Sequence, residues 1–183
     1  MLEIVLPAVE YWDEKKEEFV VAKKEQKLQF MHSLVSLSKW ESKYCKPFLS
    51  THDKTDEEIL DYIKFMTLTQ NVKDETYERL FSSPSAVQKI QEHINAPMTA
   101  TTFVENGSGK SNSEQITAEL IYYWMISLQI PVEFQKWHLN RLLTLIRVCN
   151  IKNQPPKKMS RKEIDARNAA LNAKRRKQFN TPG

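Results

Sequence analysis

Glycine is scarce in this sequence, with 3 residues among 183 and none before position 107. Tight catalytic turns and oxyanion loops commonly need glycine, because a residue without a Cβ adopts their backbone angles at little cost. The first hundred residues therefore offer little of the loop chemistry of an enzyme, and we expect no enzymatic activity. Residues 98–112, which hold two of the three glycines, are predicted to form an exposed loop.

Cysteine is rarer still, with Cys45 and Cys149 alone, so the chain has no disulfide framework. Cys149 is expected to pack as a small apolar side chain, and a disulfide with Cys45 is the less favoured alternative. Long apolar runs are also missing, because no segment reaches the roughly 20 uninterrupted apolar residues of a membrane span. The start of the chain lacks the features of a signal peptide. These absences predict a cytoplasmic protein without a membrane segment.

Motifs for metals and nucleotides are incomplete. The four histidines share no H-E-x-x-H or C-x-x-C spacing: His32, His52, His93 and His138. His138 lies on a predicted apolar helix face, where an interior histidine is favoured over a metal ligand or a general base. Residues 107–111, GSGKS, resemble part of a phosphate-binding loop, but that motif requires glycine where this sequence has Val104. We expect neither a cofactor nor a metal.

What the sequence does contain is helical periodicity over most of its length. It predicts a mainly α (α+β) protein, in which a helical domain surrounds a central helix pair. The single globular domain is predicted to cover residues 1–156, with a small antiparallel β region at 1–31 and a helical core at 32–153. The runs LEIVL (2–6), EFVVA (18–22) and KLQF (27–30) are the predicted strands.

The central helix pair is predicted from residues 111–153. Residues 113–130 are apolar on nearly every face, which is typical of a helix enclosed by other parts of a protein. Ser111 and Glu114 form a capping box at its start, and Pro131 ends it and opens a second helix. We expect Trp124 and Trp137 to hold the two helices together. Further helices are predicted at residues 34–46, 55–68, 74–81 and 83–97, the second of them opened by a capping box of Thr55 and Glu58.

Charge is divided unevenly, because residues 157–183 hold nine basic and two acidic residues, whereas residues 1–156 hold 18 basic and 21 acidic ones. A capping box of Ser160 and Glu163 predicts a helix in this basic arm, but its apolar stripe is too thin to hold it on a core, so a mobile arm is expected. Such an arm can neutralise phosphates. A solubilising or partner-seeking segment is the favoured interpretation, because no base-reading module accompanies the basic residues.

Three blocks of the sequence resemble a known family: residues 33–50 (SLVSLSKWESKYCKPFLS), 119–150 (ELIYYWMISLQIPVEFQKWHLNRLLTLIRVCN) and 155–183 (PPKKMSRKEIDARNAALNAKRRKQFNTPG). They are similar to proteins encoded among the tail genes of long-tailed bacteriophages and prophages, usually called tail assembly chaperones. The resemblance covers most of the chain and is weakest at residues 1–25 and 72–112. The broader family often has a second, longer form made by ribosomal frameshifting.

This resemblance implies a non-enzymatic protein that holds the tape-measure protein soluble in the host cytoplasm and guides tail-tube protein onto it. It implies no catalytic residues. We expect a partner groove beside the central helix pair, and basic contacts from the arm. Arg141 is expected either to pair with a carboxylate or to act as a surface anchor. The candidate partner-binding residues are Trp124, Trp137, Arg141, Lys174, Arg175, Arg176 and Lys177.

Two other functions compete with this hypothesis. A structural protein of the tail or the head-to-tail junction would remain in purified virions, where mass spectrometry would detect it. A nucleic-acid-binding protein would show steeply salt-dependent DNA binding that is lost when residues 157–183 are removed. Nucleic acid is the less favoured partner, and self-association stays open.

Overall fold

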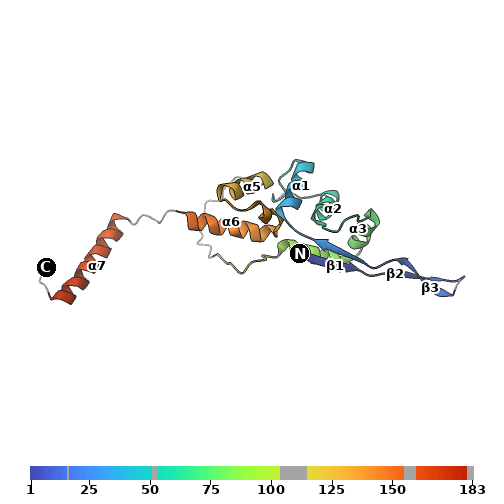
Figure 1. The fold of residues 1–183 in the computed structure, drawn as a ribbon, viewed down its shortest axis with the longest axis horizontal. Coiled ribbons are helices and arrows are strands. Elements are labelled where there is room, and N and C mark those ends of the chain that lie inside the picture. The colour runs from blue at the N-terminus through green and yellow to red at the C-terminus, as the bar shows by residue number, and fades with distance from the viewer. Residues whose placement is uncertain (16, 51–52, 104–114, 155–159, 181–183) are drawn as a thin grey trace. The chain divides into compact units, whose positions relative to one another are not determined.

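The computed structural model describes residues 1–15, 17–50, 53–103, 115–154 and 160–180. The protein is mainly α with a small antiparallel β element, which confirms the predicted fold class (Figure 1). The chain divides into two compact units, Met1–Asn150 and Ile151–Gly183. The strands are β1 (Leu2–Leu6), β2 (Val9–Asp13), β3 (Glu18–Lys23) and β4 (Gln26–Phe30). The helices are α1 (Leu34–Tyr44), α2 (Asp56–Met66), α3 (Asp74–Phe81), α4 (Pro84–Asn95), α5 (Ala118–Ser127), the 3-10 helix η1 (Val132–Lys136), α6 (Leu139–Asn153) and α7 (Arg161–Phe179).

The strands form two antiparallel pairs, β1 with β4 and β2 with β3. In the first pair, alternate residues face the helices and are buried, including Ile4 opposite Leu28. This alternation is the pattern of a strand with one solvated face. The second pair contains no buried residue, and Trp12 packs edge-on against Phe19 at its exposed end. The strand at Val9–Asp13 was not among the strands predicted from the sequence.

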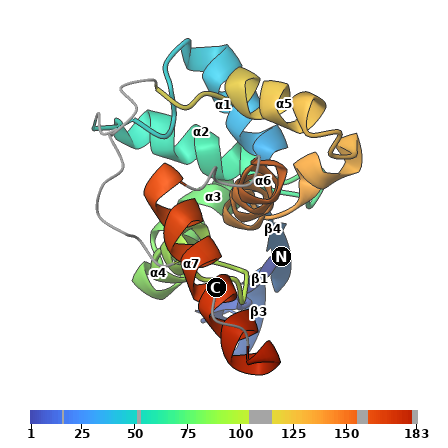
Figure 2. The same ribbon diagram turned by 90° about the vertical axis from the view of Figure 1, so that its left-hand side faces the viewer.

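Helix α1 joins two apolar clusters, and Figures 1 and 2 show it between α5 and α2. Trp40 belongs to the first cluster, with β1, β4 and the helices α2, α3 and α4. Leu34 and Leu37 belong to the second cluster, with α5 and α6. The start of α1 is fixed by a capping box, in which Ser33 and Ser36 satisfy backbone groups of the first turn. One helix thus carries two apolar faces, which is why the two clusters belong to one body.

The end of α1 shows how a chain with few glycines makes left-handed turns. The described residues with positive φ are all non-glycine: Glu17, Cys45, Asn71, Met98, Gln129 and Asn180. Cys45 caps α1 with φ 52° and ψ 36°, and its N–H donates to the Glu41 carbonyl at 2.8 Å. A side chain with a Cβ is strained in this conformation.

Replacing Cys45 by glycine is therefore expected to raise the free energy of unfolding by about 1 kcal/mol, because glycine adopts positive φ without steric strain. Urea denaturation monitored by circular dichroism measures the change. The matched control is Cys45→Ala, which removes the thiol but keeps the Cβ and should bring no such gain. A glycine variant no more stable than the alanine variant would contradict the prediction.

The predicted central helices differ from those observed. Helix α5 begins at Ala118, where the Thr117 hydroxyl accepts the Leu120 N–H, and the proposed capping box at residues 111 and 114 lies outside the described residues. The helix is also not enclosed, because Tyr123 and Ile126 are 63% and 76% exposed. Its apolar sequence predicted burial on every face, but only the face that carries Ile121 and Met125 packs into the apolar cluster with α1 and α6.

The second predicted helix is broken into η1 and α6. The break has a cause in distant residues, because His138 forms a β-bridge with Ser33 and the Leu139 N–H donates to the His32 carbonyl at 2.8 Å. These contacts hold the segment between η1 and α6 extended. Sequence periodicity continued across this break and gave no sign of it.

Two of the other predicted helix starts are confirmed. Thr55 with Glu58 and Ser160 with Glu163 form the expected capping boxes of α2 and α7. Ser83 precedes α4 with Pro84 at its first position, as predicted, although the Ser83 side chain makes no capping hydrogen bond. Every described residue of α7 is exposed, as its thin apolar stripe predicted. No helix within the described ranges combines the length and the apolar character needed to cross a membrane.

Candidate partner-binding groove

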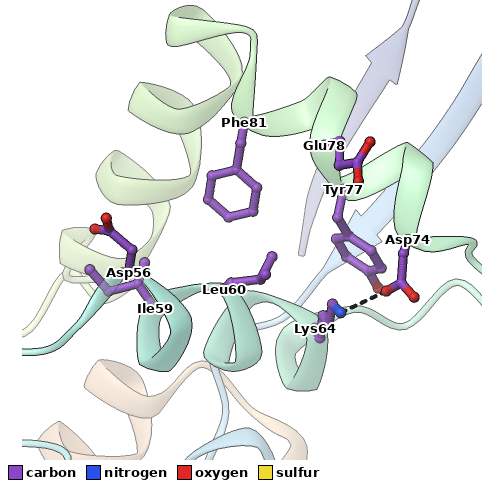
Figure 3. A pocket seen from close by; sticks show the side chains of 8 residues that line it. All are labelled: Asp56, Ile59, Leu60, Lys64, Asp74, Tyr77, Glu78 and Phe81. Atoms are coloured by element: carbon purple, nitrogen blue, oxygen red, sulfur yellow. Dashed lines mark hydrogen bonds and ion pairs between the residues drawn. The ribbon is translucent and has the colours of Figure 1, made fainter.

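An apolar groove of about 570 Å³ lies between α2 and α3. Ile59 and Leu60 of α2 form one wall, and Tyr77 and Phe81 of α3 form the other (Figure 3). Ile59 is 42% exposed, so an isoleucine side chain faces solvent inside this groove. Exposed apolar surface of this kind, bordered by polar residues, is typical of binding sites.

The groove continues as a second hollow of about 310 Å³ between α2 and α4. Ile59 and Phe81 line both sections, so the two form one continuous surface. The α4 wall of the second section is mainly apolar, with Val87, Ile90 and Ile94 beside the polar Gln91. The whole groove is therefore bounded by α2 on one side and by α3 and α4 on the other.

The position of α2 is fixed by its opposite face. The Trp40 indole N–H donates to the Glu58 carbonyl at 2.8 Å, which attaches the first turn of α2 to α1. Asp61 accepts hydrogen bonds from Lys43 and from the Tyr44 hydroxyl, and the Lys43 ammonium group lowers the pKa of the Asp61 carboxyl. These polar contacts orient α2 so that Ile59 and Leu60 face the groove.

The rim of the α2/α3 section carries three carboxylates and one ammonium group. Asp56 and Glu78 are exposed on opposite walls. Lys64 donates to Asp74 at 2.7 Å, which raises the pKa of the Lys64 ammonium group, and it lies 5.5 Å from the centroid of the Tyr77 ring (Figure 3). Lys64, the one lysine among the described residues that line this section, thus has a carboxylate partner of its own, and Asp56 and Glu78 leave the rim negative.

The predicted tryptophan pair is not formed. Trp137 stacks on Phe134 with ring centroids 4.0 Å apart, and the Arg141 guanidinium lies 4.0 Å from the Trp137 centroid. Trp124 packs against the second apolar cluster. The segments are joined instead by the Tyr122 hydroxyl, which donates to Gln135 at 2.9 Å. Arg141 is exposed and lies over an aromatic face, which fits the surface-anchor alternative, and the structure gives it no carboxylate partner among the described residues.

The four basic residues predicted as partner contacts lie together in α7: Lys174, Arg175, Arg176 and Lys177. All four are exposed. Their positions near the C-terminal end of the helix suit its dipole, which favours positive charge there. Whether they contact a partner stays a prediction.

The groove was not predicted from the sequence. The predicted helix at residues 55–68 included Ile59 and Leu60 correctly, but the partner surface was expected beside residues 111–153. Periodicity shows that a residue lies on an apolar face. It does not show whether another helix covers that face. Capping and charge gave no indication either, because the two walls come from separate helices.

Three of the histidines also come together, although their spacing in the sequence suggested nothing. His138 lies between His32 and His93, with ring centroids 5.1 and 4.9 Å away, and all three are buried. His138 Nε2 hydrogen-bonds the His93 carbonyl at 2.8 Å, and its Nδ1 accepts the Asn140 N–H at 3.3 Å. The prediction that His138 is an interior histidine with satisfied nitrogens is confirmed. His52 lies outside the described residues.

The groove offers apolar contact and negative charge. Within the part of the chain that the structure describes, no three histidine, cysteine or carboxylate side chains are grouped so that they could hold a metal ion. Comparison with protein-family models, with curated proteins and with solved structures finds no match to this chain. The arrangement fits the binding of another polypeptide along an apolar stripe.

Proposed function

We propose that this protein is a non-enzymatic assembly chaperone of a long-tailed bacteriophage, which binds the tape-measure protein in the host cytoplasm and guides tail-tube assembly. The observation that supports the proposal best is the continuous apolar groove along α2. The sequence resemblance suggests the class of partner, and the apolar lining of the groove supports binding of a helical segment there. The proposed binding surface thus moves from the helices around Trp124 and Trp137 to α2, α3 and α4.

The groove suits a helical partner in its dimensions. Helix α2 has 11 residues, which corresponds to about 16 Å or three helical turns. A helix lying in such a groove presents apolar anchors at positions i, i+3, i+4 and i+7. A tape-measure protein is a long helical chain that exposes apolar stripes before assembly. Covering one stripe removes apolar surface from water, which is worth roughly 25 cal/mol for each Å² buried.

The test is co-expression of the neighbouring tape-measure protein with this chain. Wild type is expected to raise the soluble fraction of the tape-measure protein several-fold. Ile59→Glu is expected to abolish the gain, because it places a charge on the apolar groove wall. The matched control is Ile126→Glu, since Ile126 is an exposed isoleucine on α5 outside the groove, and this variant should retain the gain.

The outcomes test both the chaperone function and the position of the binding surface. A tape-measure protein that is equally soluble with and without this chain contradicts the chaperone function. Loss of the gain in Ile126→Glu but not in Ile59→Glu would instead place the partner on α5, near Trp124. Circular dichroism of both variants checks that the fold is retained.

A further inference from the structure

The two exposed carboxylates of the groove point to the kind of helix that it accepts. Asp56 begins α2, and Glu78 lies in the middle of α3, on the opposite wall. The third carboxylate, Asp74, is already bonded to Lys64 at 2.7 Å. A helix lying on Ile59 and Phe81 would therefore have an unneutralised carboxylate on each side of it.

We propose that the α2/α3 groove selects an amphipathic helix whose apolar stripe is flanked on both sides by lysine or arginine. This inference rests on the proposed function and adds the chemistry of the partner segment. Complementary charges at a rim contribute mainly to selectivity and to the rate of association, while the apolar floor supplies affinity. The expected partner segment is thus defined by its pattern of charge as well as by its apolar anchors.

The preference belongs to the α2/α3 section of the groove. Among the described residues that line the α2/α4 section, Lys54 alone is charged, and its ammonium group lies 4.7 Å from the Phe48 ring centroid. One end of the groove is therefore acidic and the other is apolar with a single positive charge. This difference places the basic flanks of a bound helix in the α2/α3 section of the groove, beside Asp56 and Glu78, and not in the α2/α4 section.

Three synthetic helical peptides test the proposal with the full-length protein. Each has about 14 residues and the same leucine anchors at i, i+3, i+4 and i+7, and only the flanking residues differ: lysine, glutamine or glutamate. Fluorescence anisotropy measures the dissociation constants. We expect the lysine peptide to bind roughly fivefold more tightly than the glutamine peptide, and the glutamate peptide to bind most weakly. The differences should shrink between about 50 mM and about 500 mM salt.

Charge reversal of the rim gives the decisive comparison. In the double variant Asp56→Lys with Glu78→Lys the order of the three peptides is expected to invert. The matched control is Glu57→Lys with Glu75→Lys, which makes the same charge change on the same two helices outside the groove lining. This control should keep the wild-type order. The basic arm of the chain cannot produce a preference for the lysine peptide, because its nine basic residues repel that peptide.

The results separate this inference from the proposed function. Equal affinity for the three peptides, an order unchanged by charge reversal, or no binding by any peptide overturns the charge selection. If the lysine preference holds while the tape-measure protein gains no solubility, the groove accepts basic helices but the chaperone function fails. If Ile59→Glu abolishes binding of three equally bound peptides, the groove is a helix site without charge selection.

Discussion

Replacing Glu41 by alanine is expected to lower the free energy of unfolding by about 2–5 kcal/mol, although Glu41 lies outside the proposed groove. The side chain is buried on α1, and each carboxylate oxygen accepts one backbone N–H. Oε1 accepts from Phe48 at 2.8 Å and Oε2 accepts from Ala118 at 2.7 Å. Ala118 is the first residue of α5, whose N–H has no acceptor inside its own helix.

The expected loss is large because one substitution removes the acceptor of two backbone donors, the buried N–H of Ala118 and the partly buried N–H of Phe48. An unsatisfied buried donor costs about 1–3 kcal/mol, and the two losses occur together. Glu41 also joins segments 77 residues apart in the chain, since it fixes the start of α5 and the turn after α1 at once. The loss should therefore appear as a lower midpoint of the whole unfolding transition and not as local fraying.

Urea denaturation followed by circular dichroism measures this effect. Glu41→Gln keeps one acceptor oxygen but turns an NH₂ group toward the other N–H, so its loss should fall between those of wild type and alanine. The control is Glu119→Ala, because Glu119 is exposed on α5 and should change stability by less than about 0.5 kcal/mol. An alanine variant at position 41 that is as stable as this control would refute the assigned role.

Local features of this fold could be predicted because their causes are local. The capping box of Thr55 and Glu58 involves residues three apart, and any chain with that spacing can form it. The alternation of residues 2–6 likewise reports a strand with one buried face. Such patterns place elements along the sequence, and they gave the fold class without any knowledge of packing.

The groove and the buried polar contacts could not be predicted because they depend on which elements meet. Glu41 appears in the sequence as an ordinary charged residue of a helix. Its burial is explained only by the packing of Ala118, from a distant segment, against it. Ile59 appears as one more apolar helix residue, and only the gap between α2 and α3 leaves it exposed. For Tyr123 and Ile126 the prediction erred in the opposite direction: the sequence predicted burial, but both side chains are exposed. An apolar helix need not be covered on every side.

The cluster of His32, His93 and His138 is expected to make the free energy of unfolding depend strongly on pH. Burial is the main cause that lowers the pKa of His32 to about 3 and the pKa of His93 to about 4. Repulsion from the neighbouring His138, when that ring is protonated, lowers both pKa values further. His32 Nδ1 lies 2.5 Å from the Tyr62 hydroxyl, and burial raises the pKa of that hydroxyl, so Tyr62 remains protonated and donates to a neutral His32. His93 Nε2 is buried without a hydrogen-bond partner among the described residues.

The sign of the effect follows from proton binding. Below the usual histidine pKa of about 6.5 the unfolded chain takes up protons at these residues, whereas the folded protein keeps them neutral down to lower pH. The unfolded state then binds more protons, so stability falls as pH falls. The stabilisation is complete above pH 6.5 and is lost progressively toward the folded pKa values of about 4 and about 3.

Between pH 6.5 and pH 5.0, His32 and His93 together are expected to lower the free energy of unfolding by about 3 kcal/mol. Carboxylates such as Asp61, whose pKa is also lowered in the folded protein, contribute mainly below this window, near their unfolded pKa of about 4. Urea denaturation at several pH values measures the slope. The variant His93→Gln keeps the backbone carbonyl that binds His138 but cannot titrate, so about half of the fall should disappear. A free energy of unfolding that stays constant between pH 6.5 and pH 5.0, or a His93→Gln variant with the full wild-type slope, would show that these histidines do not control acid stability.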